Sequence, residues 1–473
     1  MSTSPSSPRS SPCAARSTTS SSASGTGASP GPPANTAWKP SSSPFRSPTS
    51  SRSTRSPATS RCEPSCRAGS GASARSRRPC RSRSWGNEAL RFLVCAGDPS
   101  GDIYGERLIR ALKSKQPGLR IDAVGGALMR RACDETGSSF LFDLAGLGIT
   151  GFIEPLRQVP RLISLHSRLA TLMRLERPDA AVCIDFYGFH RHVLASAKGA
   201  RVPAFYYISP QVWASRPGRI QTLKRLVDRM LVIFPFEEKL YREAGVPVTW
   251  VGHPLLDLLP EPSAKAGRHG PRIGLLPGSR RSEIARHLPT LLEAARLIRR
   301  EQPEAEFLLF AAPQTPDRPY LEALERARRR KPELAVRLVR DEGYLERSKL
   351  DFALTSSGTA TVENALLGVP MVVLYRLSWP TYALARALIR VRHIAMANLL
   401  AGRELVPELI QHEATPRRIA RKALDMLADP QRLAALRKDL LSLRGILGGP
   451  GASERAAALL LAEAAERREP LRT

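Results

Sequence analysis

The chain has 473 residues and a formal net charge of +29 at pH 7, and this length is enough for two or three domains of about 100–200 residues each. No run of 18 or more apolar residues is present, so no segment is typical of a membrane-spanning helix. Beyond residue 88 the cysteines are Cys95, Cys133 and Cys183. None belongs to a CxxC pair, which favours a reducing compartment and argues against structural zinc.

The N-terminal segment differs from the rest of the chain in composition. Residues 1–84 carry thirteen Lys and Arg residues and one acidic residue, Glu63, and so contribute +12 of the net charge. A segment that is rich in Ser, Arg and Pro and lacks apolar periodicity cannot bury enough apolar surface to offset the entropy of ordering. We predict a disordered extension over residues 1–88, either a targeting segment similar to a transit peptide or the product of a misplaced translation start.

A chain that begins near Asn87 is expected to fold and to keep its full activity, because the removed residues contribute no apolar core. Thermal unfolding and turnover of the shortened chain measure this. A loss of either would show that the extension is part of the functional protein.

From residue 90 onwards, short apolar runs alternate with amphipathic helices, a pattern typical of a parallel sheet covered on both faces. Six strands are predicted first, over residues 92–96, 121–124, 180–184, 204–208, 229–234 and 248–251. After a polar linker at residues 260–271, five more follow, over residues 273–276, 306–311, 335–339, 352–355 and 371–375. We predict two Rossmann-like domains, residues 89–254 and 255–440, and a helical segment over residues 441–473. Ligands should bind between the domains, at the carboxyl ends of the strands.

The first strand leads into a helix through a loop of small residues, "AGDPSGD", residues 96–102. A dinucleotide-binding turn would have a glycine fingerprint and bare backbone at this point. This loop instead carries two carboxylates, Asp98 and Asp102, so it is not typical of pyrophosphate binding.

Two turns of the second domain are typical of anion sites. The segment Pro277-Gly278-Ser279-Arg280 presents backbone N–H groups at a helix N-terminus, and its arginine adds a positive charge. The segment Ser356-Ser357-Gly358-Thr359 repeats this geometry, and Glu363, one turn into the helix, suits a ribose diol. Each turn alone is equally explained as a tight turn or a helix cap, but together they favour a nucleotide diphosphate.

In the first domain, Asp185 ends an apolar strand, which suits either a general base at the cleft or a helix cap. The segment Ser209-Pro210-Gln211 with Trp213 follows the next strand, where Trp213 either lines a sugar or lipid site or fills space in the hydrophobic core.

Residues 151–179 form a basic amphipathic helix that is either an anchor on an anionic membrane surface or a core-facing helix with a basic outer face. Dispersed charge and the lack of a binding motif argue against nucleic acid.

Eight segments occur together and in this order: "AGDPSGDIYG", "GLGITGFIEPL", "YYISPQVWASRPGRI", "VIFPFE", "VGHPLLD", "LLPGSRRSEI", "SSGTATVENALLGVPMVV" and "ANLLAGRELVPELIQ". Over residues 91–440 they closely resemble the lipid-A-disaccharide synthase family of bacterial glycosyltransferases. The resemblance implies a GT-B fold, with two doubly wound Rossmann-like domains facing across a cleft. Another GT-B enzyme that uses UDP-N-acetylglucosamine, a transferase or an epimerase, is the alternative.

The reaction implied by the resemblance is the inverting transfer of 2,3-diacylglucosamine from its UDP derivative to the 6-hydroxyl of 2,3-diacylglucosamine 1-phosphate. The products are a β-1,6-linked disaccharide 1-phosphate and UDP, with no cofactor and no metal. The resemblance also implies a cytoplasmic enzyme held peripherally on the inner face of the inner membrane, and it leaves a homodimer open.

Site residues follow from the same resemblance. We expect Asp185 to be the general base and Asp98 to position the acceptor, while Arg280 and Asn398 match other sensitive positions of the family. The expected substrate-binding set is Ser100, Gly101, Asp102, Ser209, Gln211, Trp213, Gly252, His253, Gly278, Ser279, Arg280, Glu283, Ser357, Gly358, Thr359, Glu363, Asn398 and Glu404.

The chain also departs from the family pattern near the acceptor. Asp185 is followed by Phe186-Tyr187-Gly188-Phe189-His190 where a Pro-Asp-Phe-Asn type of sequence is usual, so a second carboxylate is lost. Ser215 stands where a tryptophan is common, and Asp98 where glutamate is frequent. These changes leave the acyl-chain preference open.

Overall fold

The computed structural model describes residues 89–147, 154–213, 218–262, 269–313, 315–330, 334–379, 382–383, 386 and 392–468. The extension predicted over residues 1–88 lies outside these residues, as does Ser215.

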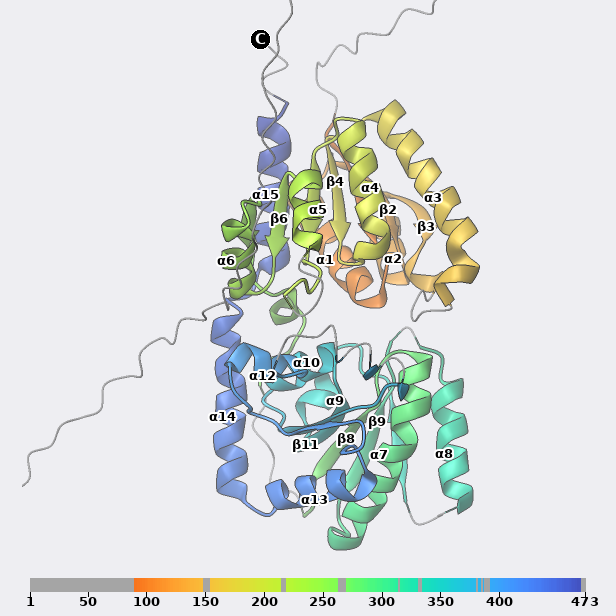
Figure 1. Ribbon diagram of the computed structural model, residues 1–473, viewed down its shortest axis with the longest axis vertical. Coiled ribbons are helices and arrows are strands. Elements are labelled where there is room, and N and C mark those ends of the chain that lie inside the picture. The colour runs from red at the N-terminus through yellow and green to blue at the C-terminus, as the bar shows by residue number, and fades with distance from the viewer. Residues whose placement is uncertain are drawn as a thin grey trace, which may run out of the picture. The chain divides into compact units, whose positions relative to one another are not determined.

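A first parallel sheet, with seven strands among the described residues, has the order β3-β2-β1-β4-β5-β6-β7 (Figure 1). Its strands are β1 (Arg91–Ala96), β2 (Arg120–Gly125), β3 (Ser139–Asp143), β4 (Ala180–Ile184), β5 (Ala204–Tyr207), β6 (Arg229–Val232) and β7 (Val248–Trp250). Between them lie α1 (Pro99–Lys115), α2 (Ala127–Thr136), α3 (Glu154–Glu176), α4 (Tyr187–Gly199), α5 (Arg219–Leu226) and α6 (Pro235–Glu243). The six predicted strands are confirmed. The prediction missed β3, a half-exposed edge strand without a continuous buried apolar run.

Alternate side chains of each central strand pack on opposite faces of this sheet, as the strand period of two requires. Phe92 and Val94 of β1 join the core on one face, beneath α1. Leu93 and Cys95 join the core on the other face, beneath α3 and α4. Because both faces are covered, the strands read as continuous apolar runs, which is why the sequence revealed them.

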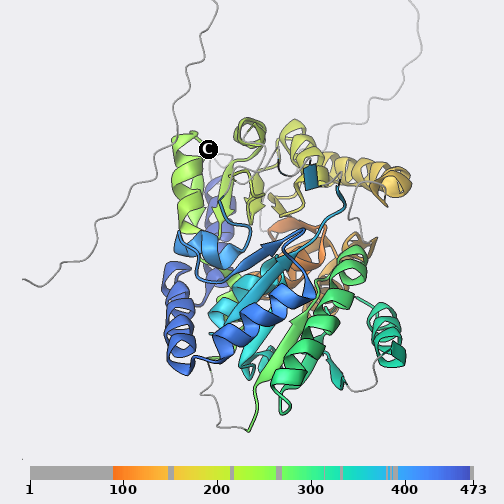
Figure 2. The same cartoon turned by 60° about the horizontal axis from the view of Figure 1, so that its bottom comes forward.

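A second parallel sheet has the order β10-β9-β8-β11-β12-β13, six strands within the described part of the chain. The strands are β8 (Arg272–Leu276), β9 (Glu306–Phe310), β10 (Val336–Val339), β11 (Phe352–Ser356), β12 (Met371–Tyr375) and β13 (Glu408–Ile410). The helices are α7 (Arg281–Glu301), α8 (Arg318–Arg330), α9 (Leu345–Ser348), α10 (Thr359–Leu366), α12 (Met396–Ala401), α13 (Pro416–Leu427) and α14 (Pro430–Ile446). Helices α7 and α13 lie side by side on one face (Figure 2). Five of these strands were predicted, and the three-residue edge strand β13 was not.

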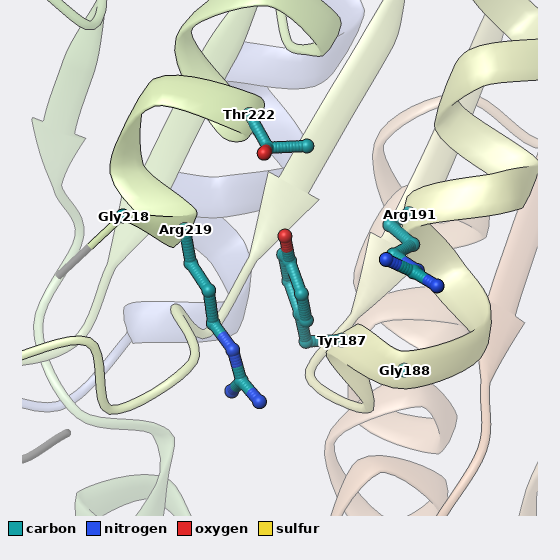
Figure 3. A pocket seen from close by; sticks show the side chains of 6 residues that line it. All are labelled: Tyr187, Gly188, Arg191, Gly218, Arg219 and Thr222. Atoms are coloured by element: carbon teal, nitrogen blue, oxygen red, sulfur yellow. The ribbon is translucent and has the colours of Figure 1, made fainter. Parts of the chain in front are cut away.

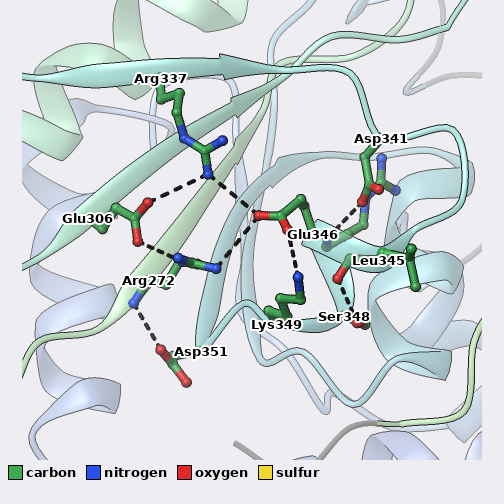
Figure 4. A network of polar contacts seen from close by, with 10 residues as sticks. Arg272, Glu306, Arg337, Asp341, Leu345, Glu346, Ser348, Lys349 and Asp351 are labelled. Atoms are coloured by element: carbon green, nitrogen blue, oxygen red, sulfur yellow. Dashed lines mark hydrogen bonds and ion pairs between the residues drawn. The ribbon is translucent and has the colours of Figure 1, made fainter. Parts of the chain in front are cut away.

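Charged side chains form a network at the amino ends of β8 to β10 (Figure 4). Arg272 pairs with Glu306 at 2.7 Å and with Glu346 at 3.7 Å, and Arg337 and Lys349 reach Glu346 at 3.5 and 2.7 Å. Ligands of parallel sheets bind at the opposite, carboxyl ends. We therefore assign this network to stability.

The chain crosses between the two sheets twice, and the two crossings touch. The first runs from β7 into the short helix η2 (Pro254–Asp257), and the second from α14 into α15 (Ala452–Glu466). The His253 N–H donates to the Leu447 carbonyl at 3.2 Å. Helix α15 then packs on α1, and Glu463 pairs with Arg229 of β6. We call the first sheet with α1–α6 and α15 the first lobe, and the second sheet with its helices the second lobe.

Candidate active site

Asp98 and Asp185 follow the two strands between which the strand order of the first sheet reverses. Strands β1 and β4 are paired in parallel, with Ala96 opposite Ile184 at their carboxyl ends. The residues that follow these strands therefore lie side by side at the topological switch point, where open α/β sheets bind ligands.

The backbone around Asp185 adopts a conformation that is uncommon for residues with side chains. Asp185, Phe186 and Ile208, which follow β4 and β5, have φ angles of 48°, 49° and 64°. The Asp185 carbonyl accepts hydrogen bonds from the Tyr206 hydroxyl at 2.6 Å and from His190 Nδ1 at 2.7 Å, which hold the turn. Left-handed non-glycine residues that are fixed by their surroundings are typical of functional sites.

The carboxylate of Asp185 has the electrostatic setting of a general base. Its Oδ1 accepts from the Phe186 N–H at 2.8 Å. Burial, and then the negative charge of Asp98, raise the pKa of Asp185 to about 7, against the opposing charge of Arg280. A carboxyl group that titrates near neutral pH is suited to take a proton during a reaction.

Asp98 is the N-cap of α1. Its Oδ1 accepts from the Gly101 N–H at 2.9 Å. Burial raises the pKa of Asp98, while the Gly101 N–H and the charge of Arg280 act in the opposite direction. A Cβ atom on Gly101 would lie 2.7 Å from Asp98 Oδ1, so a larger residue there would displace the capping carboxylate. The Ser100 side chain is half-buried in the same first turn.

Asp102 does not share the site with Asp98. Its carboxylate is almost fully buried and accepts from the N–H groups of Gly126, Leu128 and Met129 at 2.7, 3.1 and 3.1 Å. These are orphan donors at the N-terminus of α2, which a carboxylate satisfies well. Asp102 thus caps α2, and its expected contact with substrate stays a prediction.

Glu237 is a buried carboxylate near the site that the sequence analysis did not single out. Its Oε1 accepts from the Ser209 hydroxyl at 2.5 Å and from Trp213 Nε1 at 3.2 Å. Burial raises the pKa of Glu237 to about 7, and its charge contributes to raising that of Asp185. The polar groups of Ser209 and Trp213 therefore both donate hydrogen bonds to Glu237, whereas the Gln211 side chain is exposed. Its position in the sequence, in the first helical turn after the apolar residues 232–234, is the signal from which Glu237 could have been predicted as a site residue.

Arg280 is brought to the site by the turn after β8. It is the N-cap of α7, and its Nη1 lies 2.9 Å from Glu283 Oε1. Gly278 has a φ of 112°, and a Cβ atom there would lie 2.4 Å from Glu283 Oε2. Ser279 is exposed, and its carbonyl accepts from Thr315 Oγ1 at 2.7 Å. Arg280 of the second lobe acts electrostatically on both Asp98 and Asp185 of the first lobe.

The second predicted anion turn lies at the start of α10. Gly358 and Thr359 are exposed there, whereas the Ser357 hydroxyl donates to the Ile394 carbonyl at 2.8 Å. Glu363 forms an ion pair with Arg347, and the Tyr344 hydroxyl donates to it at 3.3 Å. The carboxylate predicted to bind a ribose diol is therefore already engaged by protein groups.

Asn398, predicted to bind substrate, is fully buried and has all its hydrogen-bonding groups in use. Its Nδ2 donates to the Val406 carbonyl and to Glu408, each at 2.8 Å, and its Oδ1 accepts from the N–H groups of Leu405 and Val406 at 2.8 and 2.9 Å. Asn398 therefore holds the loop before β13, and its expected contact with substrate stays a prediction. Glu404 is exposed on that loop.

Replacing Asn398 with alanine is expected to lower the free energy of unfolding by about 2–4 kcal/mol, because it leaves buried N–H and carbonyl groups unpaired. Denaturant unfolding measures this. Unchanged stability together with a loss of UDP affinity would show that Asn398 contributes to UDP binding and not to stability.

Gly252 and His253 lie at the first crossing between the lobes. Gly252 has a φ of 85°. His253 is buried, and its Nδ1 accepts from the Leu255 N–H at 3.1 Å. Burial lowers the pKa of His253 to about 3, so the ring is neutral. Gly252 therefore allows the left-handed backbone of the first crossing, and the hydrogen bonds of His253 hold that crossing in place.

A family model described as lipid-A-disaccharide synthetase matches residues 92–462. The chain belongs to this family. The lipid-A-disaccharide synthase of Syntrophus aciditrophicus is 41% identical over 377 residues, 78% of this chain and 96% of that protein. The same enzyme of Geobacter sulfurreducens is 38% identical over 383 residues, 79% of this chain and 97% of that protein.

Among solved structures, the UDP-N-acetylglucosamine 2-epimerase from Neisseria meningitidis bound to its UDP-sugar is similar, with a TM-score of 0.54. It shares 15% sequence identity and covers 79% of this chain and 100% of that one. At this identity the likeness shows only the fold, which is GT-B. The predicted fold and family are thus confirmed, and the family match decides against an epimerase.

Membership of the lipid-A-disaccharide synthetase family makes the chain a UDP-sugar-dependent glycosyltransferase of lipid A biosynthesis, as the sequence predicts. Among the residues that the structure describes, no helix has the length and apolar character needed to cross a membrane. Within the same residues, no group of three or more His, Cys, Asp or Glu side chains is placed to hold a metal ion.

Proposed function

We propose that the chain joins two acylated glucosamine units at the carboxyl ends of its two sheets, with Asp185 as the general base. The donor is UDP-2,3-diacylglucosamine and the acceptor is 2,3-diacylglucosamine 1-phosphate. The observation that carries this assignment is the strained turn that holds Asp185, with a pKa near 7, beside Asp98 and within electrostatic range of Arg280.

In the proposed reaction, the acceptor 6-hydroxyl oxygen attacks C1 of the donor sugar from the face opposite to the diphosphate. As the new C–O bond forms, the bond between C1 and the diphosphate oxygen breaks, UDP leaves with the electron pair, and the configuration at C1 inverts. Asp185 takes the proton from the attacking hydroxyl. Asp98 accepts a hydrogen bond from the acceptor and so positions it.

The leaving diphosphate needs positive potential where its negative charge develops. Arg280 supplies a guanidinium, and the N-termini of α7 and α10 supply N–H groups without intrahelical partners. Glu283 holds Arg280 in place through their 2.9 Å contact. This supports binding of UDP by the turns at residues 277–280 and 356–359.

Helix α3 supports the proposed peripheral position on an anionic membrane, at the cytoplasmic face. Leu165, Leu169 and Met173 are buried against the first sheet, so the core-facing reading of this helix is correct. Yet the Ile163 side chain remains 63% exposed, and Arg161, two residues earlier in the same helix, is exposed as well. Apolar and basic side chains together bind anionic lipid surfaces. A homodimer stays a prediction.

Mass spectrometry of the product formed from defined UDP-diacylglucosamine and diacylglucosamine 1-phosphate tests the proposed function. We expect a disaccharide 1-phosphate and one equivalent of UDP. Release of UDP without a disaccharide, or transfer to an acceptor other than an acylated glucosamine phosphate, would contradict it.

A further inference from the structure

We propose that the pocket between the N-terminal ends of α4 and α5 binds the phosphomonoester of the acceptor sugar. This inference rests on the proposed function, because it assigns a place to one group of the proposed acceptor.

The pocket has a volume of about 380 Å³ and is lined by Tyr187, Gly188, Arg191, Gly218, Arg219 and Thr222 (Figure 3). Two of the lining side chains, Arg191 and Arg219, carry guanidinium groups, two others, Tyr187 and Thr222, carry hydroxyl groups, and no lining residue is a carboxylate. A volume in this range is typical of small-molecule sites. Phosphate groups are bound most strongly by arginine, whose planar group donates two parallel hydrogen bonds. The charge and shape of the pocket therefore favour a phosphate.

The two arginines approach the pocket from different helices. Arg219, at the start of α5, lies over the Tyr187 ring, with its guanidinium carbon 4.6 Å from the ring centre. This contact orders the long Arg219 side chain against an aromatic face. Arg191 lies one turn into α4, and its Nε is 3.2 Å from His192 Nε2. Figure 3 shows Tyr187 between the two arginines.

Gly188 leaves the pocket wall between these side chains open. A Cβ atom at this position would have no neighbour within 4 Å, so no packing demands a glycine here. Without a side chain, the first-turn N–H groups of α4, which have no intrahelical acceptor, are accessible to an anion. They add to the two guanidinium groups.

The position of the pocket matches the chemistry of the acceptor. Tyr187 and Gly188 follow Asp185 in the chain after one intervening residue, Phe186. In a glucosamine 1-phosphate, C1 and the carbon that bears C6 are both bonded to the ring oxygen. The phosphate therefore lies close to the reacting 6-hydroxyl. A sugar with this hydroxyl at Asp185 has its phosphate beside the first turn of α4.

The test compares Arg191→Gln, Arg219→Gln and the double variant with the full-length protein in a neutral detergent. The matched control is Arg225→Gln, an exposed arginine of α5 that does not line the pocket. The probes are 2,3-diacylglucosamine 1-phosphate and its dephosphorylated counterpart, the latter used as acceptor or competitive inhibitor. Thermal unfolding and UDP affinity report on the fold.

Each pocket variant should raise the KM for the phosphorylated acceptor by about tenfold or more, as expected for a lost charge-assisted hydrogen bond. The affinity for the dephosphorylated probe, the KM for the donor and the behaviour of Arg225→Gln should not change. If Arg219→Gln unfolds because its contact with Tyr187 is lost, the kinetics of Arg191→Gln alone test the proposed phosphate site.

Two results would overturn the assignment while leaving the proposed function intact. One is an equal loss of affinity for both probes, or no loss for either. The other is an unchanged acceptor KM together with lost binding to phosphatidylglycerol-containing vesicles, which would make the ligand a lipid headgroup. If the unaltered protein forms no disaccharide from the phosphorylated acceptor, the proposed function itself has failed.

Discussion

Replacing Asp185 with asparagine is expected to lower turnover by about 10²–10⁴-fold, the usual worth of general base catalysis, and to leave the affinity for UDP nearly unchanged. Asparagine has almost the same shape, and its side-chain oxygen can still accept from the Phe186 N–H, so the turn after β4 should persist. It cannot take a proton from the attacking hydroxyl. Steady-state kinetics and UDP titration measure the two effects.

The matched control is Asp98→Asn. Asparagine is as good a helix N-cap as aspartate, so α1 should keep its cap, and the main effect should be a higher KM for the acceptor. If Asp98→Asn abolishes turnover while Asp185→Asn only weakens binding, the two roles are reversed. The sequence suggested that Asp185 had no acidic neighbour to replace it, but the structure places buried Glu237 within electrostatic range.

The raised pKa of Asp185 also sets the direction of two pH effects. A base must be deprotonated, so kcat/KM should rise with pH and level off above about 7.

The folded protein holds the Asp185 proton more tightly than the unfolded chain, so the contribution of Asp185 to stability is present at low pH and is lost as pH rises towards 7. Asp185→Asn should therefore unfold at a higher temperature than the parent at pH 8, and by a smaller margin at pH 5.

Replacing Arg280 with alanine is expected to raise the transition-state barrier by about 3 kcal/mol, or roughly 10²-fold in turnover, because a charge-assisted contact with the leaving diphosphate is lost. The Arg280 side chain is 54% exposed, and its ion pair with Glu283 joins the N-cap of α7 to the first turn of the same helix. Such exposed pairs contribute little to stability. Turnover should therefore fall while the melting temperature hardly changes.

Arg281→Ala is the control for Arg280, since this neighbour is also exposed at the start of α7. It should keep its turnover. Unchanged turnover in Arg280→Ala would mean that this arginine is only a solvated helix cap. EDTA should leave turnover unchanged, and chelator-sensitive turnover would contradict a mechanism in which Arg280 and helix N-termini neutralise UDP.

Most of the fold was predictable because both faces of each sheet are covered. Strands buried on both faces become unbroken apolar runs, and β4 and β12 were predicted with the bounds that the structure gives. Strands β3 and β13 were missed because they lie at sheet edges, where side chains are partly exposed and the runs are short. The other two edge strands, β7 and β10, were nevertheless predicted, so an edge position weakens the periodic signal without removing it.

The candidate site was predictable only in part, because a sequence locates strand ends but not the partners of a side chain. Asp98, Asp185 and Arg280 follow strands β1, β4 and β8, and the fold brings their charges together. The partners of Asp102 lie 24 to 27 residues away, and Glu363 pairs with an arginine 16 residues away. Only the folded chain reveals that such polar side chains are already engaged.

The return of α15 to the first lobe makes the second lobe an insertion within the first. Ala456, Ala457 and Leu460 of α15 are fully buried in the core that also contains Leu108 of α1. A nascent chain therefore exposes this apolar face of α1 until residues 452–466 have been synthesised, while the whole second lobe precedes them and can fold first. The lobe that carries Asp98 and Asp185 is thus completed last, and chains that end before residue 452 should be recognised by chaperones.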